Sequence, residues 1–130
     1  MAANFTVSVV APERVVVETE ARFAAVPAWD GEIGFLAHRA PIVIKVGIGR
    51  LRIQTPGEEL VFFVAGGFAQ MVDDRLTILT QEALRAEEID RRAAERALAD
   101  ARAMTVTDEA SHLARQGALE RARVQLRLAG

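Results

Sequence analysis

The order of hydrophobic and polar residues changes once along this 130-residue chain, near Glu82. Before this point, apolar and polar residues alternate over short runs such as residues 50–53 and 75–79, and a period of two is typical of strands that bury one face. After it, small apolar residues recur every four positions, which predicts helices. All four prolines, all seven aromatic residues and seven of the nine glycines precede the change. We therefore expect two modules, residues 1–84 and residues 85–130.

The first module is predicted to consist of short strands separated by tight turns. The candidate strands are residues 5–10, 15–18, 21–27, 42–46, 49–54, 59–65, 68–72 and 76–80. Three dipeptides have the fixed or positive φ angles that turns need: Pro56-Gly57, Gly66-Gly67 and Asp73-Asp74. Many short strands at this spacing predict a β-sandwich or barrel. Residues 29–49 are dense in glycine, proline and charge, and we expect a long loop there that is either merely polar or functional.

The second module is predicted to be a hairpin of two antiparallel helices. Negative charge favours the start of a helix, and acidic residues stand where the first helix is expected to begin: Glu87, Glu88 and Asp90. Thr107 is the expected N-cap of the second helix. Each helix carries a stripe of mostly alanine residues at a spacing of four: Ile89, Ala93, Ala97 and Ala101 in the first, and Ala110, Ala114, Ala118 and Ala122 in the second.

A contact surface made of alanines has an energetic consequence. Apolar burial stabilises by about 25 cal/mol per Å², and each alanine methyl group buries little area compared with a leucine side chain. We therefore expect a hairpin that is helical by propensity, but whose helices are held only loosely to each other and to the first module. Such a hairpin would be able to move. A static, packed hairpin is the alternative.

Composition and charge exclude several classes of function. The net charge is −2, which disfavours nucleic acid as the main partner. The absence of cysteine excludes disulfides, thiolate zinc sites and cysteine nucleophiles. The first residues do not form a signal peptide, and the apolar runs are too short to span a bilayer. We expect a soluble protein that reaches a membrane only through partner proteins, without direct insertion.

The chain also lacks the residues of a recognisable active site. Ser111 and His112 are neighbours on a predicted helix and point in different directions, so they cannot form a nucleophile–base pair. Ser8 and His38 are far apart in sequence, and two isolated histidines do not make a metal site. No phosphate-binding loop or complete dinucleotide fingerprint is present. We expect a protein that is not an enzyme, holds no metal and requires no cofactor.

An ordered set of motifs runs along the chain. It includes Gly31-Glu32-Ile33-Gly34-Phe35-Leu36, Ala40-Pro41-Ile42, Val64-Ala65-Gly66-Gly67-Phe68 and Leu76-Thr77-Ile78-Leu79-Thr80. In this order and over this length, the motifs resemble the epsilon subunit of the F-type, proton-translocating rotary ATP synthase. The resemblance implies an all-β plus α fold, namely a ten-stranded β-sandwich over residues 1–84 followed by an antiparallel two-helix hairpin over residues 85–130.

The resemblance also implies a function. Epsilon subunits are not catalysts: their sandwich binds the gamma subunit and the loops of the membrane c-ring, and turns with them. Their hairpin either folds down or extends toward the catalytic alpha and beta subunits, where it blocks ATP hydrolysis. The implied location is peripheral, at the cytoplasmic face of the bacterial inner membrane, within the ATP synthase complex.

Site residues follow from the resemblance where this chain matches it. Gly31 and Glu32 fall where the family contacts the c-ring. His38, Arg39 and Pro41 fall where it contacts gamma. Here the histidine lies one place earlier than in the family pattern, and Arg39 occupies the family's histidine position.

The resemblance further implies two sites on the hairpin. Some relatives bind ATP as a regulatory ligand at the start of the first helix, and Ile89, Asp90 and Arg92 correspond in part. The family's arginine stands one residue later, where this chain has Ala93, and one residue turns a helical side chain by about 100°. Basic residues of the last helix are expected to contact the beta subunit, or alternatively to form a solvated face with i,i+4 pairs: Arg115, Arg121, Arg123 and Arg127.

Other classes of protein stay open from the residues alone. A free-standing β-sandwich that binds peptide or carbohydrate would use the hairpin as a dimerisation arm, and would form a stable dimer without affinity for gamma. A small hydrolase is the third alternative, and the missing active site disfavours it.

Overall fold

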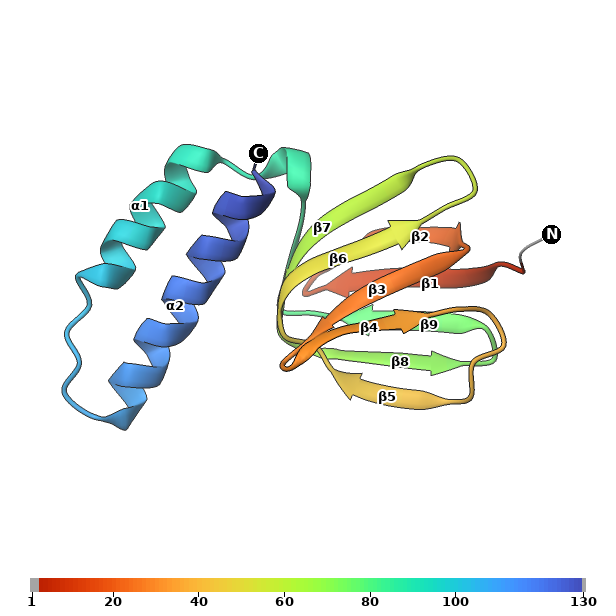
Figure 1. The fold of residues 1–130 in the computed structure, drawn as a ribbon, viewed down its shortest axis with the longest axis horizontal. Coiled ribbons are helices and arrows are strands. Elements are labelled where there is room, and N and C mark those ends of the chain that lie inside the picture. Colours follow the sequence, from red (N-terminus) through yellow and green to blue (C-terminus); the bar gives the residue numbers. More distant parts are fainter. Residues whose placement is uncertain (1–2, 130) are drawn as a thin grey trace. The chain divides into compact units, whose positions relative to one another are not determined.

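The computed structural model describes residues 3–129 and is drawn in Figure 1. The chain divides into two units after Arg85, one residue later than the division expected from the sequence. The first unit is built of strands and the second of helices. Each unit is described by itself.

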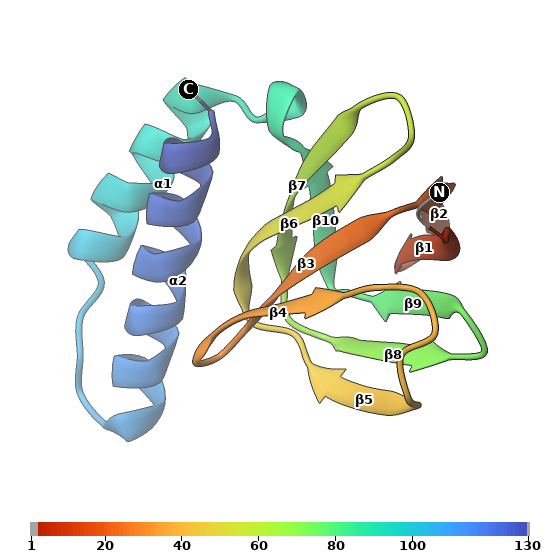
Figure 2. The ribbon, with the colours of Figure 1, turned by 45° about the vertical axis from the view of Figure 1, so that its right-hand side comes forward.

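Ten strands form the first unit. They are β1 (Phe5–Ala11), β2 (Arg14–Ala21), β3 (Phe23–Ala28), β4 (Gly31–Phe35), β5 (Ile42–Lys45), β6 (Ile48–Gln54), β7 (Glu59–Ala65), β8 (Phe68–Val72), β9 (Arg75–Leu79) and β10 (Glu82–Arg85). They make two five-stranded sheets, with the orders β2-β1-β9-β8-β5 and β10-β7-β6-β3-β4. Neighbours are antiparallel except β1 and β9, which run parallel. The expectation of a β-sandwich followed by two helices is confirmed (Figures 1 and 2).

The two sheets enclose one apolar core. Alternate residues of the strands point into it, so the two-residue period that predicted strands also predicts which side chains are buried. Large side chains fill this core, and they are among the fully buried residues of the chain: Phe5, Phe35, Leu51, Ile53, Phe62, Met71, Leu76 and Ile78.

Two strands were missed in the residue-by-residue prediction. β4 contains Gly31 and Gly34, which have low strand propensity, and it lies in the segment expected to be a long loop. It is nevertheless a strand because the two-residue turn at Trp29-Asp30 folds it back onto β3, with Ala28 opposite Gly31. β10 is only four residues long and pairs with β7, as Figure 2 shows.

The predicted turn residues adopt turn conformations. Asp73 and Asp74 have φ angles of 49° and 57°, and they close a two-residue hairpin between β8 and β9. Gly66 and Gly67 have φ angles of 73° and 103°. At Gly67 a Cβ atom would lie 1.8 Å from the carbonyl oxygen of Leu79, so only glycine fits there.

The second unit begins with a short 3-10 turn, Ala86–Glu88, and continues as α1 (Arg91–Arg102) and α2 (Glu109–Leu128). Glu87 and Glu88 therefore lie in the 3-10 turn, and the prediction that they begin the first α-helix is wrong. The N-cap of α1 is Asp90, whose carboxylate accepts a hydrogen bond from the Ala93 N–H at 3.2 Å. The predicted N-cap of α2, Thr107, is also wrong by one residue, because Asp108 takes that role.

The predicted alanine stripes are buried only in part. Ala101 and Ala122 are buried, whereas Ala93, Ala110 and Ala114 are exposed. The reason is geometric: four residues turn a helix by about 400°, so a strict spacing of four drifts by about 40° at each step. The residues that are buried lie seven positions apart in α1 and gather between residues 119 and 125 in α2: Ala94, Ala101, Leu119, Ala122, Val124 and Gln125.

Candidate functional site

An exposed apolar row crosses the outer face of the first sheet. Its members are Val15, Val10, Leu79 and Phe68, which lie opposite one another on β2, β1, β9 and β8. The side chains of Val15, Leu79 and Phe68 remain 61%, 53% and 57% exposed. Aliphatic and aromatic residues are expected on the buried side of a strand, so four of them aligned on the solvent side indicate a surface that a partner covers.

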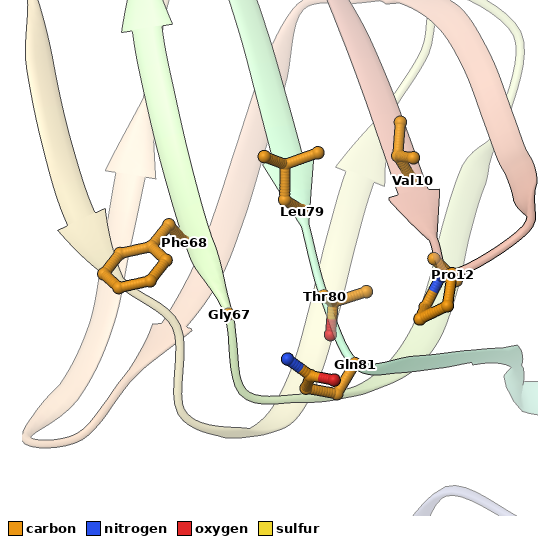
Figure 3. Close-up of a pocket in the computed structure, with 8 residues that line it drawn as sticks. Val10, Pro12, Gly67, Phe68, Leu79, Thr80 and Gln81 are labelled. Atoms are coloured by element: carbon orange, nitrogen blue, oxygen red, sulfur yellow. The ribbon is translucent and has the colours of Figure 1, made fainter.

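The row borders an open hollow at one end of the sheet. Its volume is about 310 Å³, and Figure 3 shows Val10, Phe68 and Leu79 on three neighbouring strands, with Pro12, Thr80 and Gln81 below them. Lys45 of β5 lies opposite Phe68 and ends the row with a positive charge. The next row of the same face is polar on four strands, with Gln70, Thr77, Ser8 and Glu18, and it ends at the exposed Val43 of β5. Polar residues therefore border the apolar row on β8, β9, β1 and β2, and no local pattern in the sequence marks the row.

The segment between β4 and β5, residues 36–41, is here called the crossover loop because it joins the two sheets. His38 lies in it with a φ of 67°, a left-handed conformation that costs about 1–2 kcal/mol for a residue with a Cβ. The His38 N–H donates a hydrogen bond to the Asp74 carboxylate, and the imidazole Nδ1 lies 3.1 Å from the other carboxylate oxygen. The backbone oxygen of Asp74 in turn accepts from the Thr6 N–H at 3.0 Å.

Arg39 follows in the same loop and turns back over the core. Its guanidinium carbon lies 5.3 Å from the centre of the Phe35 ring, a cation–π contact with a side chain that is fully buried. Pro41 is exposed just before β5. The three residues assigned to gamma thus share one loop, but His38 is engaged with Asp74 and Arg39 with Phe35.

Gly31 and Glu32 lie on β4, at the edge of the second sheet. Gly31 has a φ of 137° where the chain leaves the β3–β4 turn. The Glu32 carboxylate lies 3.5 Å from Arg52 and 4.0 Å from Arg50, both on β6. Exposed pairs of this kind contribute roughly 0–1 kcal/mol, so they orient Glu32 more than they stabilise the sheet.

Trp29 stands at the β3–β4 turn, close in sequence to this carboxylate. Its side chain is 84% exposed, the largest exposed fraction among the large apolar residues that the structure describes. Sequence reasoning noted Trp29 only as the start of an unusual segment. A tryptophan in a two-residue turn is the signal that could have indicated a functional role for Trp29, because tryptophan is normally at least partly buried.

The three residues assigned to nucleotide binding lie at the start of α1. The carboxylate of Asp90 is occupied as the N-cap. Arg92 is exposed. Its neighbour Arg91 reaches across the hairpin, where its guanidinium lies 3.5 Å from the Leu126 carbonyl oxygen and 3.5 Å from the Glu95 carboxylate.

The arginines of α2 differ in their surroundings. Arg115 donates to the Arg102 carbonyl oxygen at 3.5 Å, so its head group meets the C-terminal end of α1. With the Arg91–Leu126 contact, each helix of the hairpin sends one arginine to the carbonyl end of the other, where the helix dipole favours positive charge. Arg123 and Arg127 are exposed and four residues apart, so they share a face of α2. Arg121 is half-buried.

A capping box fixes the start of α2. Asp108 accepts from the Ser111 N–H at 2.8 Å, and the Ser111 hydroxyl accepts from the Asp108 N–H at 3.0 Å. Hydrogen bonds to the carboxylate from the Ser111 backbone N–H and, secondly, from the Ser111 side chain hold the pKa of the Asp108 carboxyl below its ordinary value of 3.8. Ser111 therefore has a structural role as a capping residue. This role is sufficient to explain its position next to His112.

Two properties of the described residues bear on ligands and membranes. Between residues 3 and 129, no three side chains of the histidine, cysteine, aspartate or glutamate type come together as a metal site. Neither of the two described helices combines the length and the apolar composition that crossing a membrane requires.

Comparison with known proteins first defines the class. Residues 4–86 match the family described as "ATP synthase, Delta/Epsilon chain, beta-sandwich domain". The chain is 40% identical over 119 residues to the ATP synthase epsilon chain of Rhodopirellula baltica, covering 92% of this chain and 93% of that protein. It is 31% identical over 134 residues to the ATP synthase epsilon chain of Nitratidesulfovibrio vulgaris, covering 100% and 98%. The chain belongs to the epsilon chain family of ATP synthase.

Solved structures agree with this assignment. A chain in the Euglena gracilis mitochondrial ATP synthase, solved with OSCP, F1 and the c-ring, has a TM-score of 0.82 at 27% identity, over 93% of this chain and 78% of that one. A chain from the central stalk and c-ring of the Tetrahymena thermophila mitochondrial enzyme has a TM-score of 0.76 at 12% identity, over 96% of both chains. The second likeness concerns the fold alone.

Proposed function

We propose that this protein is a non-catalytic rotor subunit in the central stalk of ATP synthase, and that its hairpin inhibits ATP hydrolysis. The observation that carries the proposal is the apolar row on the sandwich of a chain from the epsilon family. An exposed patch that includes Phe68 and Leu79 is costly in water and is suited to a permanent partner. Gamma is that partner in the proposal.

The gamma-docking surface combines the apolar row with the crossover loop. Both lie on the first sheet, at opposite ends of β8 and β9, since Phe68 begins β8 and Asp74 lies in the turn that follows it. In the proposal, Phe68 and Leu79 supply buried apolar area and Arg39 supplies a directed charge. Because apolar burial is not directional, the charged loop sets the orientation of the partner.

A second partner meets the β3–β4 hairpin. The c-ring is the proposed partner there, with Glu32 as the charged contact and Gly31 allowing close approach of the backbone. Arg50 and Arg52 hold Glu32 at the sheet edge, and Trp29 adds exposed apolar area at the adjoining turn. In this way the sandwich connects gamma to the c-ring, and through that complex it lies peripherally at the cytoplasmic face of the bacterial inner membrane.

The hairpin is the proposed regulatory element. Three of its six buried residues are alanines, Ala94, Ala101 and Ala122, so the hairpin buries little apolar area for each residue. Arg123 and Arg127 share one exposed face of α2 and are the proposed contacts of the beta subunit, with Arg115 and Arg121 alongside. ATP is a proposed regulatory ligand at Ile89, Asp90 and Arg92, and no other cofactor is required.

The test uses the full chain and a chain ending at residue 86. We expect both to bind purified gamma in titration calorimetry, and we expect only the full chain to slow ATP hydrolysis by the cognate catalytic complex. A full chain that neither binds gamma nor changes the hydrolysis rate would falsify the proposal. Light scattering on the same samples tests the rival class, since a free-standing binding module with a dimerisation arm would be a stable dimer.

A substitution pair tests the docking surface. Leu79→Asp places a charge inside the apolar row, whereas Gln70→Asp places one in the adjacent polar row, on the neighbouring strand β8. We expect the first variant to lose most of its affinity for gamma and the second to keep it, because desolvating an unpaired carboxylate is costly only where the partner covers it. Equal losses in the two variants would show that gamma docks elsewhere.

A further inference from the structure

We propose that Asp74 is a positioning residue for partner docking: it holds His38 in the left-handed conformation and thereby fixes the course of the crossover loop and the place of Arg39. The identity of the partner, gamma, rests on the proposed function above. The positioning itself rests on contacts within this chain. It assigns a role to a turn residue that lies 36 positions away from His38 in sequence.

The first step is the hydrogen bond between the two loops. Left-handed backbone is unfavourable for histidine, so something outside the crossover loop has to compensate for it. Asp74 does so with both carboxylate oxygens, one accepting from the His38 N–H and the other 3.1 Å from the imidazole Nδ1. A hydrogen bond to an ionised carboxylate is among the stronger kinds. The His38 backbone is thus tied to the sandwich rather than left to the preference of the loop.

The second step is that Asp74 is itself fixed. It lies in the two-residue turn between β8 and β9 with a φ of 57°. Its carbonyl oxygen accepts from the Thr6 N–H at 3.0 Å, which joins the turn to β1. A carboxylate on such a turn has little freedom, so it can impose a geometry on the crossover loop instead of following it.

The third step links His38 to Arg39. A single left-handed residue reverses the direction of the chain, and here it returns Arg39 to a point 5.3 Å above the Phe35 ring, four residues back. With His38 in an ordinary extended or helical conformation, the chain would leave in another direction and Arg39 would lose this contact. Asp74 therefore acts on Arg39 through the His38 backbone, and the imidazole is not the contact offered to the partner.

The experiment compares the same change at adjacent positions. Asp74→Gly deletes the carboxylate and keeps the positive φ of the turn, and Asp73→Gly makes the identical change one residue earlier. In the full chain, we expect the hydrogen-bonded His38 amide to give a low-field NMR signal and to be protected from exchange. We expect Asp74→Gly to remove both properties and to lower the affinity for gamma about tenfold. We expect Asp73→Gly to change none of these. Equal effects from both variants would overturn the proposal.

Conservative variants separate positioning from a general loss of structure. Asp74→Asn keeps one acceptor for the His38 N–H, so it should restore most of the protection and affinity lost in Asp74→Gly. His38→Gly removes the imidazole but adopts the left-handed conformation freely, and should bind gamma nearly as well as the wild type. His38→Val should bind weakly, because a β-branched residue does not tolerate a positive φ. Equally weak binding by His38→Gly and His38→Val would show that the imidazole is the contact.

A double-mutant cycle tests whether Asp74 acts through Arg39. Asp74→Gly should weaken gamma binding in the wild type but not in the Arg39→Ala background. Additive effects would contradict positioning of Arg39. The amide measurements need no partner, so they decide the positioning even if gamma fails to bind. A wild-type chain with a protected His38 amide and no affinity for gamma would refute the proposed function alone.

Discussion

The sandwich and the hairpin are stabilised by different kinds of side chain. Between the sheets, bulky residues such as Phe5, Phe62 and Met71 are fully buried. In the hairpin, three of the six buried residues are alanines. Because stabilisation by burial scales with apolar area, the sandwich gains far more per residue than the hairpin does.

This difference indicates which part of the chain is rigid and which part can move. The hairpin has strong local order: Asp90 and Asp108 cap its helices, and Arg91 and Arg115 reach the carbonyl ends of the opposite helices. These interactions support each helix but bury little apolar area between them. A hairpin of this kind can separate its helices at low cost while each stays helical, whereas the sandwich loses its core if either sheet moves.

The largest expected effect comes from the core of the sandwich. Leu51→Ala removes a fully buried side chain from β6, and we expect it to lower the free energy of unfolding by about 2–5 kcal/mol in urea denaturation. The matched control is Leu36→Ala, where the side chain is 60% exposed and the change should stay within about 0.5 kcal/mol. Similar values for the two variants would mean that the core does not dominate the stability of the sandwich.

A second prediction tests the turn that joins β7 to β8. Gly67→Ala would place a Cβ against the Leu79 carbonyl oxygen and force a positive φ on alanine. We expect the free energy of unfolding to fall by about 1–3 kcal/mol or more, measured by thermal melting of the full chain. Gly57→Ala is the control, because nothing lies within 4 Å of the place that its Cβ would take and its φ is not positive. An unchanged melting temperature for Gly67→Ala would show that this turn can rearrange.

The sequence predicted the two modules well because each carries a strong periodic pattern. Most strands of the sandwich were placed within a few residues, since alternation is clear in runs such as residues 75–79. β4 was missed because its glycines hide the alternation, and its partner β3 supplies the reason for its strand conformation. Pairing partners are a property of the fold, and a local pattern does not contain them.

The site was predictable only in part, for the same reason. The resemblance pointed to the crossover loop, but nothing near His38 in sequence indicates that Asp74 faces it. The apolar row is likewise invisible along the chain, because its four members come from four strands and align only through the register of the sheet. Contacts between distant segments need the topology, whereas helices and turns need only their own residues.

A third prediction concerns a fully buried alanine of the hairpin. Ala122→Leu inserts three extra carbons at a fully buried position, and we expect overpacking to cost about 1–3 kcal/mol. Amide exchange should rise in α1 and α2 and stay unchanged in β1 and β9. Ala110→Leu is the control because Ala110 is exposed. Unchanged exchange in α1 and α2 would show that the hairpin accommodates the larger side chain.

The smallest expected effect tests the local order of the hairpin through pH. The pKa of Asp108 is lowered by its hydrogen bonds with Ser111, so the cap contributes stability above the ordinary value of 3.8 and loses it as the pH falls through the lower, folded value. Amide exchange in the first turn of α2 should therefore rise below pH 3.8 in the wild type. In Asp108→Asn, whose amide oxygen still accepts the Ser111 N–H, this acid-dependent component should be absent. Every other carboxylate is common to the two proteins, so the difference between them isolates Asp108. The same acid dependence in both would mean that α2 is held by its packing and not by its cap, and the contrast between a packed sandwich and a locally ordered hairpin would then be wrong.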